Sequence, residues 1–440
     1  MINVVVIGGG IGGLALAQGL RKNGVKVAVY ERDTHRDDRV DRYRLAISPA
    51  GSRSLRACLP DQRWQAFLDT AGRPGGGFGF LRTDLRPLVV VEDAIMYPET
   101  ADPAERSYPV DRHTLRGILL DGLADVVHYG KIFERYELAA DGRPTAHFAD
   151  GTSATGDVLI GADGINSRLR SQYLPAATRR DARAFGVGLK LPLDDDTRAW
   201  LPARLGQGMN LVLTGAPYFL FTSVFERQQP GRDDYLLCAF VARNDQFPPH
   251  PERLDGARLK AHIAELATGW HPLLRRLIDE CPVNDVSAFP FQASDRPVPW
   301  TPSRVTALGD AMHGMPPAGG NGANTALRDA ALLTHQLSQA VRGEAPLRDM
   351  IGEYEAEMRE YGFQAVDLAM KTLRQGLMSN PIDVFFSRSW FRLCSMAAPL
   401  RRMTFGSSWA KISEPRAWEQ AETRPNHEPT PTTPTTPQRR

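Results

Sequence analysis

Several features that would place this chain in a metal-binding, membrane-spanning or nucleic-acid-binding class are missing from it. Its 440 residues include only four cysteines, which are scattered and form no Cys-x-x-Cys pair or metal-ligand spacing. No apolar run approaches the roughly 20 residues that a membrane-spanning helix needs. The net charge of +2 gives no strong field for a nucleic acid or an acidic partner. We therefore expect no metal, no nucleic-acid partner and no membrane-spanning segment.

A signal peptide is also not recognised at the N-terminal end. The apolar run at residues 2–7 is short, lacks a basic leader and continues directly into glycines. Scattered cysteines are typical of buried free thiols in a reducing compartment. We therefore expect a cytoplasmic protein, and its length suits two intertwined domains.

The first residues predict the opening of a parallel sheet. Residues 2–7 form a β-branched run ended by glycine, residues 14–20 have helical spacing, and residues 26–30 read as a second strand. A strand–helix–strand unit of this kind predicts an α/β fold with a Rossmann-like domain. The sheet does not finish in one pass, so this domain is discontinuous. Its further strands are predicted at 130–137, 145–149, 157–161 and 305–308.

The middle of the chain predicts a second domain built on a β-sheet. Residues 209–225 and 234–243 read as long strands, several of them apolar on both faces. Such strands are typical of a sheet with one face on the core and the other on a ligand or a neighbouring domain. Residues 255–280 have helical spacing, and a small excursion near 75–105 is assigned to the same domain.

The C-terminal part predicts helices at 322–342 and 350–374, followed by an aromatic and basic segment at 382–411. That segment could cover the mouth of a substrate site, form a dimer contact or lie on a membrane surface. The tail from 421 is rich in Pro and Thr and is predicted to be disordered. The predicted units are the discontinuous Rossmann-like domain (1–74, 106–176 and 296–375), the second, sheet-based domain (75–105 and 177–295), a C-terminal helical segment (376–420) and a disordered tail (421–440).

A glycine motif follows the first strand and opens the first helix. Gly8, Gly10 and Gly13 fit the pattern G-x-G-x-x-G. The first glycine permits the tight turn, the second lets the backbone approach a pyrophosphate, and the third brings the helix close to the sheet. Glu31 ends the next strand, about 20 residues later, where a carboxylate can accept both ribose hydroxyls of an adenosine. This half of the site suits FAD or NAD.

A second glycine-rich segment, at 309–324, decides between these dinucleotides. Asp310 leaves the last strand, where it can accept hydrogen bonds from a ribityl chain. A Pro-Pro pair then stiffens the following loop, and three glycines keep side chains away from a flat ring. The helix that starts near Gly322 would point its positive end at the ligand, favouring the negative charge of a reduced flavin. The two segments together predict FAD bound lengthwise. The Rossmann-like unit (1–74, 106–176 and 296–375) is therefore predicted to be the FAD-binding domain, and the sheet-based unit (75–105 and 177–295) the substrate domain.

The chain resembles the FAD-dependent aromatic monooxygenases of the p-hydroxybenzoate hydroxylase type, the single-component class A flavoprotein hydroxylases. The resemblance covers most of residues 1–375. It is carried by the glycine motif at 8–13, by Asp163-Gly164 and the residues around it at 157–168, and by Gly309-Asp310 through Asn324.

The resemblance implies roles for individual residues. Arg112 would reach the pyrophosphate–ribityl region, Asp163 would belong to the motif linked to both FAD and NAD(P)H, and Pro317 would line the isoalloxazine ring. The expected cofactor-binding residues are Gly8, Gly10, Ile11, Gly13, Glu31, Arg32, Arg44, Arg112, Asp163, Asp310, Pro317, Gly322, Ala323 and Asn324.

The resemblance also implies the reaction. NADH or NADPH would reduce the flavin, and O2 would then form a flavin C4a-hydroperoxide that hydroxylates or epoxidises an aromatic or polycyclic, largely apolar small molecule. The protein would have to exclude water and place the substrate near the flavin. A flavin dehydrogenase, oxidase or reductase without oxygen transfer, and a flavoprotein that only binds a ligand, remain as alternatives.

The substrate wall and any acid–base residue are less well defined by the sequence. Asn210, Phe219, Phe221 and Phe225 are candidates for the substrate-facing wall, although the parity of the strands is not fixed. His313 lies within the flavin motif, where a loop-fixing hydrogen bond is favoured over a catalytic role. No catalytic side chain is assigned. Possible general bases are Tyr97, Tyr218, Tyr235 and His262.

Overall fold

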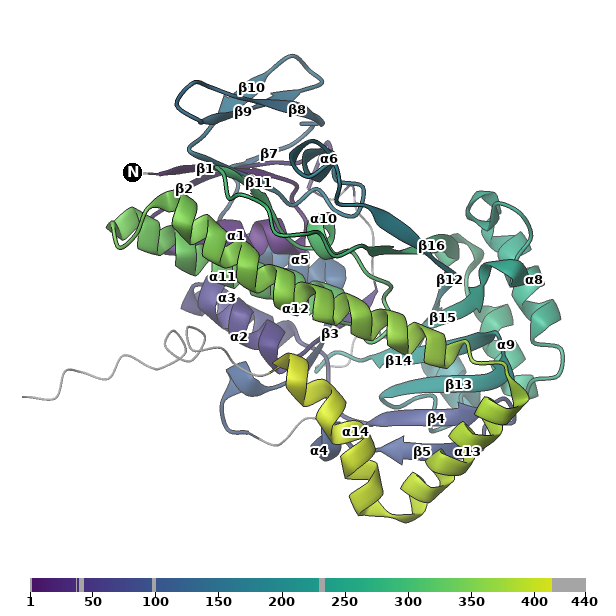
Figure 1. Cartoon of the computed structure of the whole chain (residues 1–440). Coiled ribbons are helices and arrows are strands. Elements are labelled where there is room, and N and C mark those ends of the chain that lie inside the picture. The colour runs from purple at the N-terminus through teal and green to yellow at the C-terminus, as the bar shows by residue number, and fades with distance from the viewer. Residues whose placement is uncertain (1, 37, 39–42, 97–99, 229–233, 414–440) are drawn as a thin grey trace, which may run out of the picture.

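The computed structural model describes residues 2–36, 38, 43–96, 100–228 and 234–413. Two sheets dominate it, and a long helix, α12 (Leu347–Gly376), runs alongside both of them (Figure 1). The expected α/β fold, with a Rossmann-like domain, a second sheet-based domain and C-terminal helices, is confirmed.

The first sheet is parallel throughout and has the strand order β17-β11-β1-β2-β7. Its central strand, β1, is buried almost completely because it carries β-branched residues on both faces. The chain therefore returns to this sheet after long excursions, as the sequence predicts. The strands are β1 (Asn3–Ile7), β2 (Lys26–Tyr30), β7 (Val127–His128), β11 (Val158–Gly161) and β17 (Val305–Ala307).

Two of the predicted strands do not join this sheet. β8 (Phe133–Leu138) and β9 (Pro144–Phe148) pair antiparallel, and with β10 (Ser153–Thr155) they form a separate three-stranded sheet. The turn at Asp141 and Gly142 folds the strands back on each other, and most side chains of β8 are exposed. The fifth parallel strand is instead the short β7, which the sequence did not reveal.

The second sheet has seven strands in the order β16-β12-β15-β14-β13-β4-β5. One of its faces packs against α8 (Gly256–Leu266) and α9 (Pro272–Glu280), and the other faces the body of the molecule. The excursion near 75–105 contributes β4, which pairs parallel with β13. The strands are β4 (Phe78–Arg82), β5 (Pro87–Val91), β12 (Arg179–Pro192), β13 (Met209–Ala216), β14 (Tyr218–Phe225), β15 (Tyr235–Arg243) and β16 (Ser287–Ser294).

Helices cover both sheets, and a small two-stranded sheet of β3 (Arg44–Ile47) and β6 (Tyr108–Asp111) lies between them. The glycine motif and the flavin motif lead directly into α1 and α11, whose contact is part of the main core. The helices around the parallel sheet are α1 (Ile11–Lys22), α2 (Pro49–Cys58), α3 (Asp61–Thr70), α5 (Arg112–Leu120), α6 (Arg168–Tyr173), α10 (Asp310–His313) and α11 (Gly322–Arg342). Those around the second sheet are α4 (Asp93–Met96), α7 (Asp195–Trp200), α8 (Gly256–Leu266) and α9 (Pro272–Glu280).

The aromatic and basic C-terminal segment forms two helices, α13 (Pro381–Met396) and α14 (Ala398–Ser413). They lie along the β4–β5 end of the second sheet (Figure 1). The tail predicted to be disordered, 421–440, lies outside the described residues. Across the described residues, none of the helices is both long and apolar enough to cross a membrane.

Candidate functional site

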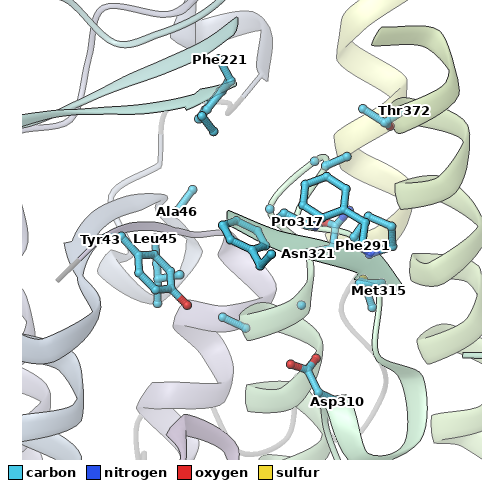
Figure 2. Close-up of a pocket in the computed structure, with 18 of the residues that line it drawn as sticks. Tyr43, Leu45, Ala46, Phe221, Phe291, Asp310, Met315, Pro317, Asn321 and Thr372 are labelled. Atoms are coloured by element: carbon cyan, nitrogen blue, oxygen red, sulfur yellow. The ribbon is translucent and has the colours of Figure 1, made fainter. Parts of the chain in front are cut away.

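One cavity of about 1770 Å³ connects the glycine motif of the first sheet with the inner face of the second. Ligand sites commonly enclose roughly 300–1,000 Å³, so this space can hold a dinucleotide together with a second molecule. Figure 2 shows Asp310 and Phe221 at opposite ends of an open region, with Pro317 and Asn321 between them.

The turn between β1 and α1 fits a pyrophosphate. Gly8 has a φ of 111°, and a Cβ there would lie 2.3 Å from the carbonyl oxygen of Ala162. A Cβ at Gly13 would lie 2.2 Å from the carbonyl oxygen of Gly8, whereas a Cβ at Gly10 would meet nothing within 4 Å. Gly8 and Gly13 thus allow tight backbone packing, and Gly10 leaves open space beside the start of α1. No side chain caps this helix, so its N–H groups face the cavity.

Glu31 lies at the end of β2 and lines the cavity, although its side chain is almost completely buried. Its carboxylate accepts hydrogen bonds from the backbone N–H groups of Gly9, at 2.5 Å, and Asp33, at 3.0 Å. These bonds fix the orientation of the carboxylate beside the pyrophosphate turn. A ribose can therefore meet a pre-oriented acceptor here.

Three arginines reach the same part of the cavity. Arg32 follows Glu31, Arg44 begins β3 and Arg112 begins α5. The Arg112 guanidinium stands 5.4 Å from the centre of the Tyr43 ring, and its charge opposes the rise that burial causes in the pKa of Asp310. These cations line the same cavity as the two glycine-rich segments, so they can help to neutralise a bound diphosphate.

Asp163 lines the cavity, but one of its carboxylate oxygens is used within the protein. That oxygen, Oδ2, accepts hydrogen bonds from the N–H groups of Arg168, at 2.9 Å, and Leu169, at 3.3 Å, at the start of α6. Burial raises the pKa of Asp163, and these hydrogen bonds oppose the rise. The Asp-Gly motif therefore fixes the loop between β11 and α6 against the cavity.

Asp310 stands on the opposite side of the cavity, in the turn after β17. It lies deep in the molecule, where burial raises its pKa and the charges of His313 and Arg112 lower it. More than a third of the residue is nevertheless exposed, because its carboxylate opens into the cavity (Figure 2). Water there weakens the effect of burial on its pKa. The Cα of Gly322 lies close by, since a Cβ built there would be 3.8 Å from Oδ1 of Asp310.

The start of α11 is the second helix end that faces the cavity. Its N-cap residue, Asn321, makes no capping hydrogen bond through its side chain, and its first turn carries no acidic residue. Gly322 and Ala323 line the cavity there, opposite Pro317. The N–H groups and the helix dipole can therefore stabilise negative charge on a bound ring.

His313 has a structural role, as its position in the motif predicts. It is fully buried, and its Nε2 lies 2.6 Å from Oδ2 of Asp329. The same carboxylate accepts hydrogen bonds from the N–H of Gly309 and the hydroxyl of Tyr361. Burial lowers the pKa of His313, but the Asp329 carboxylate raises it further, so the net shift is upward. This buried network fixes the turn that presents Asp310.

Strand parity separates the predicted substrate residues. Phe219 and Phe221 of β14 line the cavity. Asn210 of β13 points to the opposite face, where it is bonded to Arg204 and Thr222. The alternating side chains Leu211 and Leu213 take its place on the cavity face.

Phe225 and Asn324 are also not brought to the cavity. Phe225 has the parity of Phe219 but lies beyond the cavity's edge, where its ring packs on Tyr235. The side chain of Asn324 binds the backbone of Ala46, Ser48 and Gly320 and so ties α11 to β3. The other expected cofactor-binding residues all line the cavity.

The possible general bases lie away from the cavity or outside the described residues. Tyr218 donates a hydrogen bond to Leu266, and Tyr235 donates one to Asp111, each from a position that does not line the cavity. His262 contacts the backbone oxygen of Gln246. Tyr97 lies outside the described residues.

Sequence reasoning missed one wall of the cavity. Near its C-terminal end, α12 contributes Leu368, Lys371, Thr372 and Gln375. These residues have i, i+3, i+4 and i+7 spacing and so share one face of the helix. The mostly polar character of that face, close to the end of a long helix, is the signal that could have identified it.

The residues present fit FAD. Two helix starts without side-chain caps open onto the same cavity, and open space lies beside Gly10. A carboxylate stands at each end of the predicted cofactor path, Glu31 for the adenosine ribose and Asp310 for the ribityl chain. We found no group of His, Cys, Asp or Glu in the described residues that could hold a metal ion.

Comparisons with known proteins agree with this geometry. Residues 141–369 match the family described as FAD binding domain, and residues 6–70 match an NAD(P)-binding Rossmann-like domain. The chain is 30% identical over 422 residues to the dual O-methyltransferase/FAD-dependent monooxygenase elcB of Phaeosphaeria nodorum. That alignment covers 83% of this chain but only 45% of elcB, so the chain spans about half of that relative's length. It is 28% identical to a FAD-dependent urate hydroxylase of Klebsiella pneumoniae, with 89% of this chain and 94% of the relative covered.

Solved structures show the same fold. A putative FAD containing monooxygenase from Photorhabdus luminescens is 32% identical and has a TM-score of 0.78. The match covers 87% of this chain and all of that one. The complex of Klebsiella pneumoniae HpxO with FAD and uric acid is 22% identical and has a TM-score of 0.74. That match covers 93% of this chain and 97% of HpxO. The chain therefore belongs to the FAD-dependent monooxygenase family of the p-hydroxybenzoate hydroxylase type, and its cofactor is FAD.

Proposed function

We propose that the protein is a monooxygenase that uses NAD(P)H and O2 to hydroxylate or epoxidise an aromatic or polycyclic, largely apolar small molecule. The observation that carries this proposal is the single cavity that joins the FAD-binding residues to the apolar face of the second sheet. A protein that used FAD only for electron transfer between small polar partners would not need so large an apolar chamber beside the ring.

The proposed reaction inserts one oxygen atom of O2 into the substrate and reduces the other to water. NAD(P)H, O2, a proton and the substrate give NAD(P)⁺, water and a product that carries one oxygen atom from O2. When bound, FAD supplies the redox chemistry, by accepting a hydride from the nicotinamide and activating O2 once it is reduced.

The protein's own residues would bind and orient the reactants. Glu31 would accept the hydroxyls of the adenosine ribose, Arg112 would neutralise the diphosphate, and Asp310 would hold the ribityl chain. The start of α11 would stabilise negative charge on the ring. The cavity face of β13 to β15 would exclude water, because it presents Leu211, Phe221 and other apolar side chains.

The domain boundaries given above and a cytoplasmic location belong to the same proposal. The sheet and cavity geometry supports two interleaved units, because the second sheet takes its strands from both 75–105 and 177–295. Four buried free cysteines are compatible with a reducing compartment. We would search for the substrate by testing planar aromatic molecules.

An anaerobic titration tests the proposal. The purified protein would be titrated with NADH and with NADPH, in the presence and absence of aromatic compounds, while the flavin absorbance is followed. We expect the flavin to be bleached by a nicotinamide, faster with a bound aromatic ligand, and to be restored by air. A flavin that neither nicotinamide reduces would contradict the proposal and favour a protein that only binds its ligand.

The alternative of a dehydrogenase, oxidase or reductase predicts a different product. Such an enzyme would leave the substrate without added oxygen and would return all the electrons of NAD(P)H as hydrogen peroxide or to another acceptor. Mass spectrometry of the product separates these two reactions.

A further inference from the structure

The C-terminal helices contribute aromatic side chains to the cavity, beyond the part of the chain that matches the FAD binding domain family. Phe391 of α13 and Phe405 of α14 pack against Phe80 of β4, with ring centres 4.8 and 5.4 Å from it. Phe78 lies 4.9 Å from Phe80 and 6.4 Å from Phe221 of β14. These five rings, Phe78, Phe80, Phe221, Phe391 and Phe405, form a continuous surface that we call the aromatic wall.

Contacts among the rings of the aromatic wall do not bury them completely. All five line the cavity, and each is only half-buried. Leu220, the neighbour of Phe221 on β14, is by contrast fully buried in the core against α8 and α9. The aromatic wall thus keeps apolar ring surface open to the cavity, which is unfavourable in water unless a ligand covers it.

Two arginines fix the helices that carry two of the five rings of this wall. The Arg401 guanidinium binds both carboxylate oxygens of Glu92, at 3.0 and 2.8 Å, and also reaches the carbonyl oxygen of Cys394. Arg388 donates a hydrogen bond to the carbonyl oxygen of Thr214 at the end of β13. Because α13 is bonded to β13 and α14 to the residue that follows β5, these contacts help to fix the positions of Phe391 and Phe405.

We propose that the aromatic wall is a stacking site for the distal rings of a planar, multi-ring substrate. The helices α13 and α14 thereby determine the size of substrate that the protein accepts. The inference rests on the proposed function, since it names the substrate class of the same cavity. It also assigns the aromatic C-terminal segment to one of its three possible roles, the cover of the substrate site.

Ring number should decide affinity at such a site. Aromatic pairs gain energy from offset or edge contacts in addition to the area that they bury. A single-ring ligand can contact only part of a surface made of five rings, whereas a planar ligand of several rings can cover more of it. The loss of one ring from the aromatic wall should therefore weaken a multi-ring ligand more than a single-ring one.

The test compares phenol with 1-hydroxypyrene as probes. Dissociation constants are measured by equilibrium dialysis against the FAD-loaded protein, without NAD(P)H, so that binding is separated from turnover. For Phe391→Ala and for Phe405→Ala we expect 1-hydroxypyrene to bind about tenfold more weakly and phenol to change less than about twofold. Phe385→Ala is the matched control, because Phe385 lies on the same helix, is exposed and does not line the cavity.

Two further measurements keep the test decisive. The flavin absorbance of each variant shows that the FAD site and the fold are intact, and Phe391→Leu keeps an apolar side chain without a ring. We expect the leucine variant to remain weakened for 1-hydroxypyrene. Equal losses for both probes, full affinity in the leucine variant, or an equal loss in Phe385→Ala would each overturn the stacking site. Tight binding of 1-hydroxypyrene without any oxygenation would leave this site standing and count against the proposed function alone.

Discussion

The two ends of the cavity are built in different ways. At the FAD end, glycines, helix starts and carboxylates form the site, and much of the contact surface is backbone. At the substrate end, side chains from one face of a sheet and from two C-terminal helices form it. Backbone sites tolerate few residue types, whereas a side-chain wall can vary as long as it stays apolar. Substitutions at the cofactor end should therefore weaken FAD binding, whereas substitutions at the substrate end should change which ligands the cavity prefers.

The largest effect is expected from a change of charge at Glu31. Glu31→Lys would put a cation where the ribose needs an acceptor and would leave the Gly9 N–H without its carboxylate partner. Because the position is almost completely buried, we expect FAD to bind roughly a hundred to a thousand times more weakly, as measured by flavin titration of the apoprotein. Glu31→Gln keeps one acceptor oxygen and should lose much less. Unchanged FAD affinity in the lysine variant would show that the adenosine lies elsewhere.

Glu355 is a buried carboxylate that does not line the cavity, so changing it should alter stability without altering FAD binding. Burial raises the pKa of Glu355 from 4.5 to about 7, and a hydrogen bond from Tyr173 opposes the rise. Between these pH values the Glu355 carboxyl binds more protons in the folded protein than in the unfolded chain, so its contribution to stability is fully present below pH 4.5 and is lost as the pH rises through about 7. This part of the free energy of unfolding amounts to at most about 3 kcal/mol.

Glu355→Gln should remove that pH dependence in denaturant titrations between pH 5 and 8, a range set by the raised pKa of about 7. FAD affinity should not change, because Glu355 does not line the cavity. A variant that kept the full wild-type slope would place the titrating group elsewhere.

A smaller loss is expected at the ribityl end of the FAD site. Asp310→Ala removes the carboxylate that opens into the cavity, and we expect FAD to bind about thirtyfold more weakly while the fold persists. Asp383→Ala is the control, since Asp383 is an exposed carboxylate that lines the same cavity on α13. Purification of Asp310→Ala with a full complement of FAD would contradict the assignment.

The smallest effects test strand parity at the substrate end. Val212 is fully buried against α8 and α9, whereas its neighbour Leu211 lines the cavity. Val212→Ala should lower the free energy of unfolding by about 1–2 kcal/mol and leave probe binding unchanged. Leu211→Ala should destabilise the protein less and change the affinity for phenol and 1-hydroxypyrene. The reverse pattern would mean that the two faces of β13 are assigned the wrong way round.

The sequence predicted the cofactor end well because its residues act through local rules. A glycine turn such as Gly8 needs a positive φ, and a helix that starts at Gly322 needs no distant contact to point its dipole. The substrate end depended on strand parity and on segments far apart in the chain. Asn210 and Leu213 read alike as members of an apolar strand, and only the pairing of β13 with β14 and β4 decides which of them faces the cavity.

Two other misses have the same cause. β8 and β9 read as ordinary strands, but their place in a separate sheet follows from the antiparallel pairing across Gly142. Phe391 and Phe405 lie in a segment for which the sequence left three roles open. Their approach to Phe80, which is distant in the chain, requires the folded structure.

The most direct test of the central claim is the origin of oxygen in the product. The FAD-loaded protein would be supplied with NAD(P)H, ¹⁸O₂ and an aromatic compound that accelerates flavin reduction, and the product would be analysed by mass spectrometry. We predict that one ¹⁸O atom enters the product and that an equal amount of NAD(P)H is oxidised. A product without the label, or NAD(P)H oxidation matched by hydrogen peroxide alone, would contradict a monooxygenase.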